Sequence, residues 1–182
     1  MALSIEPLSA EKLQYLHTAN QPFTVIGRLR LSLQDGVWEA REELREEPYL
    51  KQYPSFDGAP PEAYIKGDTH AAFLAFDNGA CVGQLMLSRT RNRCVQIEDI
   101  SVAQLRRGQG IGTRLIQKAF EWGEAKGLAA LCVECQDNNI LATRFLRNIG
   151  FEIGGVSTAL YRHLGAPYDS ESAVFWYLPI EP

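Results

Sequence analysis

The stretch VQIEDISVAQLRRGQGIGTRLIQKAFEWGEAK, residues 95–126, decides the fold of this chain. Its first eight residues alternate in the way of a half-buried strand, and this alternation predicts that Glu98, Ile100 and Val102 share one face. From Ile111 onward, apolar residues recur at every third or fourth position, which predicts an amphipathic helix. The chain therefore passes from a strand through a short glycine-rich turn into a helix.

The turn carries Gly108, Gly110 and Gly112, which let backbone N–H groups approach a bound group without interference from a Cβ atom. N–H groups at the start of a helix favour an anion, and phosphate is the usual occupant. Two common phosphate motifs are excluded. No Lys-Ser/Thr pair follows a suitably spaced glycine, and Thr113 stands where a dinucleotide fingerprint starting at Gly108 needs its third glycine.

The remaining pattern resembles the acetyl-CoA loop of the GNAT superfamily of N-acetyltransferases. It consists of Ile100-Ser101-Val102 at the end of the strand, followed by Arg107-x-x-Gly110-x-Gly112. A second signature of that superfamily is similar to Asn139-x-x-Ala142-x-x-Phe145 and the following Gly150-Phe151. Within the superfamily, the chain resembles streptothricin acetyltransferase-like members through IEDISV, RRGQGIG, ECQDNN, GFEIGG and ESAVFWYL.

The resemblance implies that the chain binds acetyl-CoA as co-substrate. Backbone groups of the strand would pair with the acetyl group and the pantetheine arm, the loop would hold the pyrophosphate, and the Asn139 side chain would reach the pantetheine. For Arg107, the backbone N–H is expected to matter more than the guanidinium. The cofactor-binding residues implied are Ile100, Ser101, Val102, Arg107, Gly108, Gln109, Gly110, Ile111, Gly112, Thr113 and Asn139.

Acetyl transfer to an amine needs a base that removes a proton from the amine. Related acetyltransferases often carry the base at the position of Glu98, which makes Glu98 the candidate catalytic residue and a candidate contact for the amine. The alternative is an ordinary half-buried carboxylate with a basic partner. Asp99 is expected on the opposite face, with a structural role. Glu134 and Tyr161 are further candidates for binding the acceptor.

The position at which family members often carry a general-acid Tyr is occupied by Leu146. Tyr161 and Tyr177 are candidate substitutes, and packed aromatic side chains with solvated hydroxyls are the alternative interpretation. Departure of the thiolate without assistance is also open, because its solution pKa lies not far above neutral.

The chain has 182 residues, 46% of them hydrophobic, and a net charge of −4, which suits a single N-acetyltransferase domain over residues 1–182. The acidic balance argues against a nucleic-acid partner and favours a small cationic amine acceptor. No apolar run suits a bilayer and no leader pattern is present, so we expect a cytoplasmic protein with no membrane partner. A homodimer is left open. The Cys132-x-x-Cys135 pair lacks a second pair and a nearby His, so no metal is expected.

The order of predicted strands and helices indicates an α+β (α/β three-layer) domain with a GNAT-like mixed central β-sheet flanked by helices. Residues 3–20 are expected to form a short helix and lead-in. Strands at 23–33 and 37–44 are predicted to meet at Asp35-Gly36. This strand and hairpin region (22–47) and a loop over 48–61 are expected to contribute to the acceptor pocket. The glutamates of the hairpin suit a solvated face better than a lining that attracts an amine.

The sequence thus predicts an acetyl-CoA-dependent N-acetyltransferase that acts on a primary amine of a small cationic molecule, with streptothricin suggested by the resemblance. Two alternatives stay open: an acetyltransferase for peptide or protein amines, and a catalytically weak acetyl-CoA-binding module.

Overall fold

The computed structural model describes residues 3–55 and 58–180. By its internal contacts the chain separates into two compact units. Unit 1 contains residues 1–22, 52–131 and 179–182, and unit 2 contains residues 23–51 and 132–178. The prediction of a single domain over 1–182 stays a prediction.

Unit 1 is built on four antiparallel strands in the order β1-β4-β5-β6. Its strands are β1 (Ser4–Pro7), β4 (His70–Asp77), β5 (Ala80–Arg89) and β6 (Cys94–Val102), and its helices are α1 (Pro61–Lys66) and α2 (Ile111–Ala125), with 3-10 turns at Ala10–Tyr15 and Gln104–Arg106. Strands β4 and β5 form an antiparallel hairpin. It turns at Asn78 and Gly79, both at positive φ, which asparagine and glycine tolerate best.

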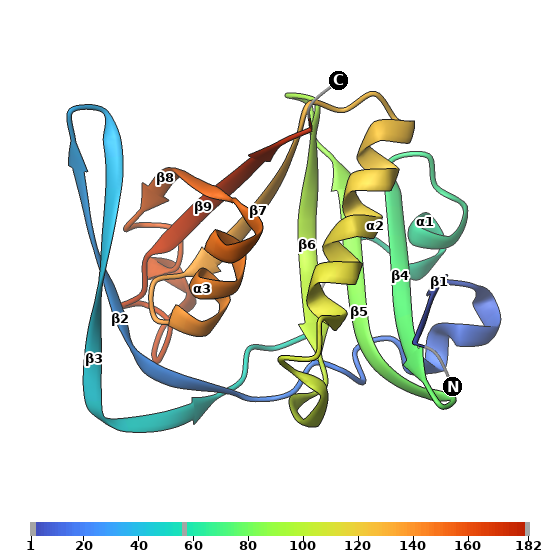
Figure 1. Cartoon of the computed structure of the whole chain (residues 1–182), viewed down its shortest axis with the longest axis horizontal. Helices are drawn as coiled ribbons and strands as arrows, with labels where there is room; N and C mark the ends of the chain where they lie inside the picture. The colour runs from blue at the N-terminus through green and yellow to red at the C-terminus, as the bar shows by residue number, and fades with distance from the viewer. Residues whose placement is uncertain (1–2, 56–57, 181–182) are drawn as a thin grey trace. The chain divides into compact units, whose positions relative to one another are not determined.

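Helix α2 covers one face of this sheet (Figure 1). Its buried side is formed by Ile111, Leu115, Ile116, Ala119 and Gly123. A Cβ atom at Gly83 of β5 would lie 3.3 Å from the Ile111 and Leu115 side chains, so the helix approaches the strand closely. The apolar period read from the sequence therefore forms the contact face of the helix, and the glycine allows that contact.

The opposite face of the unit 1 sheet holds a second apolar cluster, formed by Leu8, Tyr64, Ala72, Leu74 and Met86. Helix α1 contributes Tyr64 to this cluster, and the N-terminal segment contributes Leu8. The expectation of a short helix over 3–20 was wrong in part, since Ser4–Pro7 pairs with β4 as an edge strand before the 3-10 turn begins. Backbone pairing across the sheet overrides the weak local preference of such a short segment.

Unit 2 contains the β2–β3 hairpin and a sheet in the order β7-β9-β8. Its elements are β2 (Phe23–Gln34), β3 (Val37–Lys51), β7 (Ala130–Gln136, whose first two residues belong to unit 1), α3 (Ile140–Ile149), a 3-10 turn (Arg162–Leu164), β8 (Glu152–Ser157) and β9 (Ala173–Pro179). Helix α3 begins at the N-cap Asn139 and ends at Gly150, where φ is 110°. An asparagine that accepts from a helix N–H and a glycine at positive φ are residues typical of the two ends of a helix.

The hairpin is longer than predicted. Strand β3 continues to Lys51, so the first residues of the loop expected at 48–61 are paired with β2, and α1 begins at its last residue, Pro61. Phe56 and Asp57 of that expected loop lie outside the described residues. The four residues Arg45–Pro48 face a single residue of β2, and this bulge accommodates Pro48 in a strand because its missing N–H is not needed for pairing there.

One face of the hairpin packs on the rest of unit 2. Leu29 is 3% exposed, and its N–H donates to the Asp137 carbonyl at 2.7 Å. The Arg144 guanidinium of α3 holds both carboxylate oxygens of Glu42, at 3.0 and 2.6 Å. At the end of the hairpin, Lys51 pairs with the buried Glu171. The cross-strand alternation therefore leaves the face that carries Arg28 and its neighbours turned away from α3.

Candidate acetyl-CoA and amine site

The predicted loop forms an open N-terminus of α2 in unit 1. Gly110 is the N-cap with φ 79°, and Gly108 has φ 74°, both in the left-handed region that favours glycine. A Cβ atom at either glycine would meet nothing within 4 Å. Within the described part of the chain, no backbone N–H from Gly108 to Thr113 donates to a backbone carbonyl. These N–H groups are thus available to an anion at the positive end of the helix dipole.

The Arg107 side chain is committed to holding the loop in place. Its guanidinium donates to three backbone carbonyls, at 2.9 Å to Val102, 2.8 Å to Pro22 and 3.0 Å to Gln21. Burial lowers the pKa of this guanidinium from its ordinary value. The Arg107 N–H donates to the Gln104 carbonyl at 3.4 Å, so the expectation that this N–H matters more than the guanidinium for a ligand stays a prediction.

Strand β6 carries a bulge at Glu98. Ile97 pairs with Leu87 and Asp99 pairs with Met86, which leaves Glu98 without a position opposite on β5. The expected alternation, with Glu98 on the face of Ile100 and Val102, was therefore wrong. The side chain of Glu98 instead reaches Tyr64, which belongs to the apolar cluster beneath α1. A bulge shifts every later side chain by one position, and the sequence alone does not reveal where it occurs.

Tyr64 holds the carboxylate of Glu98. Its hydroxyl donates to Glu98 Oε2 at 2.6 Å, while its ring is 4% exposed and stands edge-on to His70 at a centroid distance of 5.1 Å. Burial, and then the hydrogen bond to Glu98, raise the pKa of Tyr64. The partner of Glu98 is thus a neutral hydroxyl rather than the basic residue of the structural alternative, and it leaves the second carboxylate oxygen for a proton or an amine.

Asp99 also lies on the α1 side of the sheet, next to Gln84 of β5. The Gln84 amide donates to Asp99 Oδ2 and accepts from the backbone N–H of His17 at 2.6 Å. Burial raises the pKa of Asp99, opposed by this hydrogen bond. The structural role expected for Asp99 fits this contact, whereas the parity argument that separated it from Glu98 does not hold. Gln84 and His17 are 67 positions apart in the chain, and no sequence pattern indicated that they would meet.

In unit 2, two further predicted residues meet. The Tyr161 hydroxyl donates to Glu134 Oε1 at 2.5 Å and accepts from the Gln136 amide at 3.2 Å. Glu134 is exposed on β7, while Tyr161 is 7% exposed. Burial first, then Glu134, raise the pKa of Tyr161, which makes it a weaker acid than a free tyrosine.

Asn139 and Leu146 belong to α3. The Asn139 side chain caps the helix by accepting from the Ala142 N–H at 3.2 Å, so its amide NH₂ is the part left to reach a ligand. Leu146 is 3% exposed and forms part of the core. Cys135, beneath this helix, has a pKa raised to about 12 by burial. A thiol held protonated is a poor metal ligand or nucleophile.

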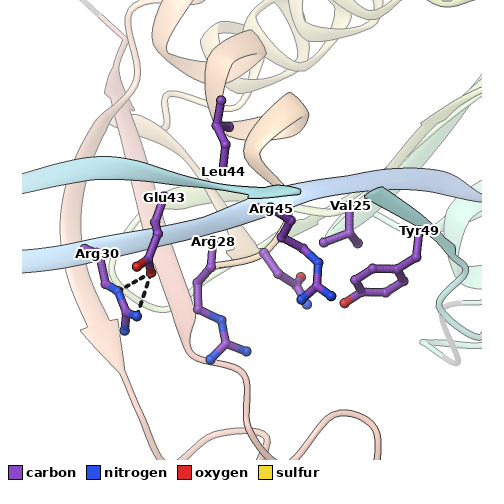
Figure 2. A pocket seen from close by; sticks show the side chains of 9 residues that line it. Val25, Arg28, Arg30, Glu43, Leu44, Arg45 and Tyr49 are labelled. Atoms are coloured by element: carbon purple, nitrogen blue, oxygen red, sulfur yellow. Dashed lines mark hydrogen bonds and ion pairs between the residues drawn. The ribbon is translucent and has the colours of Figure 1, made fainter. Parts of the chain in front are cut away.

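The glutamates of the hairpin are largely engaged by arginines. Glu42 binds Arg144, and Glu43 binds Arg30 through Oε2 at 2.6 Å. The pocket on the opposite hairpin face is lined by Arg28, Arg30 and Arg45 (Figure 2). Glu43 also lines this pocket, but its carboxylate is engaged by Arg30. Sequence reasoning missed this pocket, although the alternation of arginines with apolar residues in β2 was its signal.

The structure thus collects the predicted residues into two groups. Glu98, the end of β6 and the glycine loop lie in unit 1, and Glu134, Tyr161 and Asn139 lie in unit 2. Among the described residues, no cluster of three His, Cys, Asp or Glu side chains suits a metal ion. No helix in the same ranges is long and apolar enough to cross a membrane.

The chain is similar to known acetyltransferases over most of its length. It is 39% identical to streptothricin acetyltransferase A of Bacillus subtilis over 87% of this chain and 89% of the relative. It is 27% identical to streptothricin acetyltransferase of Streptomyces lavendulae over 97% and 93% of the two chains. Both relatives carry the substrate in their names.

Solved structures of acetyltransferases are also similar to this chain. A candidate streptothricin acetyltransferase from Bacillus anthracis, in complex with acetyl coenzyme A, is 30% identical over 98% of this chain and 99% of its own, with a TM-score of 0.89. Nourseothricin acetyltransferase is 26% identical over all of both chains, with a TM-score of 0.84. The model of the acetyltransferase (GNAT) family matches residues 37–151. With its mixed central sheet, its flanking helices and the glycine loop at the start of α2, this chain belongs to the acetyltransferase (GNAT) family.

Proposed function

We propose that this enzyme transfers the acetyl group of acetyl-CoA to a primary amine of a streptothricin-type antibiotic. The observation that carries the proposal is the N-terminus of α2, where two left-handed glycines expose N–H groups beside the end of β6. The named relatives support the acceptor, since two that are 39% and 31% identical to this chain are streptothricin acetyltransferases. Enzymes that acetylate this antibiotic protect the cell that makes them, which gives the reaction a role in resistance.

The loop fits the diphosphate of acetyl-CoA. Space is open above Gly108 and Gly110, and the guanidinium of Arg107 keeps the loop in place without occupying that space. In this proposal the N–H groups of residues 108–113 bind the diphosphate. Ile100 and Val102 bind the acyl arm through their backbone, and the contact of Asn139 with the pantetheine stays a prediction.

Glu98 would act as the base in this proposal. The amine must lose a proton before or during its attack on the thioester, and a carboxylate accepts that proton directly or through water. The bulge frees Glu98 from strict alternation, and the Tyr64 hydroxyl fixes one of its oxygens. Tyr64 therefore orients Glu98, and the free oxygen takes the proton.

The proposal assigns the binding of the cationic acceptor to Glu98, and a contact of the acceptor with Glu134 stays a prediction. Tyr161 orients Glu134 through its hydroxyl, as Tyr64 orients Glu98. The raised pKa of Tyr161 makes it a poor proton donor to the departing thiolate. Since Leu146 is buried where family members often have a tyrosine, we infer that α3 supplies no acid to the thiolate, and Tyr177 stays a candidate beside unassisted departure.

We infer that the enzyme works in the cytoplasm on a small molecule, without a nucleic-acid or membrane partner. The net charge of −4 supports this inference, because an acidic protein repels nucleic acid and attracts a cationic amine. A role of the hairpin region 22–47 and of residues 48–61 in acceptor binding stays a prediction, as does a homodimer.

The test is an acetylation assay with purified enzyme and acetyl-CoA, read by mass spectrometry. Streptothricin is compared with an aminoglycoside, spermidine and a lysine-containing peptide. We expect a mass gain of one acetyl group on streptothricin alone. Acetylation of the peptide with streptothricin unmodified would favour the peptide-amine alternative, and acetyl-CoA binding with no product on any amine would favour the binding module.

A further inference from the structure

Unit 2 carries a pocket on the outer face of the hairpin that the acetyl-transfer chemistry does not use. Its volume is about 420 Å³. In Figure 2 the side chains of Arg28, Arg45 and Tyr49 extend to the same side of the hairpin, whereas Leu44 points away from them. The lining consists of Val25, Gly27, Arg28, Arg30, Glu43, Leu44, Arg45, Tyr49 and Asn138.

The fold builds this pocket through the bulge in β3. Because the four residues Arg45–Pro48 face one residue of β2, the strand bends outward and leaves a hollow between Gly27 and Tyr49. At Gly27 the two strands come very close, since a Cβ atom there would lie 2.2 Å from the Glu43 carbonyl oxygen. The glycine is therefore required by the close approach of the strands at the edge of the hollow.

Three guanidinium groups surround the hollow, and each is held by a partner. Arg28 lies 3.5 Å from Asp137, Arg30 lies 2.6 Å from Glu43, and Arg45 stacks over the Tyr49 ring at 5.0 Å. These partners use only part of the five N–H donors of each guanidinium. Three positive charges face two carboxylates, so the pocket carries an excess of one positive charge.

A further cation lies close to this group. Lys51, which is paired with Glu171, has a pKa lowered first by burial and then by repulsion from Arg28, so it lies within electrostatic reach of the pocket arginines. The pocket is therefore unsuited to the amines of a polycationic acceptor, which it would repel. Pre-positioned guanidinium groups with free donors are suited to carboxylates and phosphates, which they bind in a bidentate manner.

Asn138 supplies the second requirement on a ligand. It is 4% exposed, and in the described part of the chain its Oδ1 has no hydrogen-bond partner. A buried acceptor without a donor costs free energy, and a ligand with an O–H or N–H group would remove that cost. A ligand that fits this lining therefore carries acceptor oxygens for the guanidinium groups and a hydrogen-bond donor for Asn138.

We propose that this pocket binds a small phosphate or carboxylate anion that also carries an O–H or N–H donor. Hydrogen phosphate and hydroxy acids such as malate both have this combination. The guanidinium groups of Arg28 and Arg45 bind the anionic oxygens, and Asn138 Oδ1 accepts from the donor. This inference does not depend on the acceptor of the acetyl transfer.

Calorimetric titration with sodium phosphate and with sodium malate tests the proposal. Ionic strength is kept constant with chloride, and acetyl-CoA is kept at saturation so that the anion does not enter the loop at Gly110. The test variant is Arg45→Gln. Arg45 makes no ion pair with the residues that the structure describes, so its replacement leaves no buried carboxylate without its partner. The matched control is Arg41→Gln on the same hairpin. The Arg41 side chain is 83% exposed and does not line the pocket.

We expect saturable binding of at least one of the two anions, weakened about tenfold or more in Arg45→Gln and within about twofold of wild type in Arg41→Gln. Phosphate binding without malate binding assigns the phosphate class, and the reverse assigns the carboxylate class. Asn138→Ala is expected to weaken the same anion while circular dichroism shows an intact fold. Equal affinity in Arg45→Gln and Arg41→Gln, or no saturable binding of either anion, would overturn the proposal.

Discussion

Replacement of Gly110 by aspartate gives the sharpest test of the acetyl-CoA loop. Gly110 has φ 79°, so any other residue there pays about 1 kcal/mol for the left-handed conformation, with Asn and Asp paying least. A Cβ atom at this position meets nothing within 4 Å. The folded protein should therefore tolerate the side chain, and the loss should appear only when the diphosphate binds.

The size of that loss follows from the added charge. A carboxylate about 5 Å from a phosphate, at an effective dielectric of about 20, is repelled by about 3 kcal/mol. Every 1.4 kcal/mol is roughly a factor of ten in affinity, so the Kd for acetyl-CoA should rise by about a hundredfold. Salt will reduce this figure, because ordinary ionic strength screens charges over about 10 Å.

Two variants isolate the charge from the backbone cost. Gly110→Asn has the shape and the left-handed tolerance of the aspartate without its charge, and should lose only a few-fold in affinity. Gly79→Asp places an aspartate at φ 81° in the β4–β5 turn, also with nothing within 4 Å. In urea unfolding, this variant should lose about as much stability as Gly110→Asp, and it should bind acetyl-CoA normally.

Isothermal titration calorimetry with acetyl-CoA, at low and high salt, measures all of these affinities. The expected order of Kd is wild type and Gly79→Asp, then Gly110→Asn, then Gly110→Asp, with the last gap narrowing at high salt. If the aspartate and asparagine variants at position 110 bind acetyl-CoA equally well, the loop does not hold the diphosphate, and the reasoning from its geometry fails.

Three other outcomes are expected. Glu98→Gln should lower turnover by roughly a hundredfold or more while calorimetry shows unchanged acetyl-CoA affinity; near-normal turnover would leave Glu98 a structural residue. Burial raises the pKa of Asp99, so the stability contributed by its protonated form is present below about pH 4 and is lost as the pH rises through the raised pKa. The free energy of urea unfolding should therefore depend less on pH in Asp99→Asn than in wild type. Parallel pH curves for the two proteins would contradict this. Iodoacetamide at pH 8 should label the partly exposed Cys81 well before Cys135, whose pKa is raised to about 12; mass spectrometry showing equal labelling would be contrary evidence.

Short-range signals explain what could be predicted. The glycine loop, the Asn139 cap and the Asp35-Gly36 hairpin each depend on the conformational preferences of a few neighbouring residues. The strand and helix around residues 95–126 follow from periodicity, and the two signatures of the loop and of α3 were sufficient for the family. The structure confirms the strand and the helix of this stretch as β6 (Cys94–Val102) and α2 (Ile111–Ala125).

The hydrogen-bond partners of the predicted site residues could not be predicted from these local patterns. The bulge at Glu98 is a property of how β6 pairs with β5, and Tyr64, which holds Glu98, lies 34 positions earlier in the chain. The pairs Gln84–Asp99 and Tyr161–Glu134 likewise join separate elements. A sequence states which side chains exist, whereas strand register determines which of them meet.

The charge pattern of the hairpin shows the same division. The sequence by itself determined that β2 and β3 form a hairpin rich in glutamate and arginine, because the turn and the alternation are local. Only the tertiary structure decided that Arg144 of α3 binds Glu42. The same holds for the bulge at 45–48, beside which Arg28 and Arg45 line a pocket. Charges act through space, so their effect is set by the packing that brings distant residues together rather than by their order along the chain.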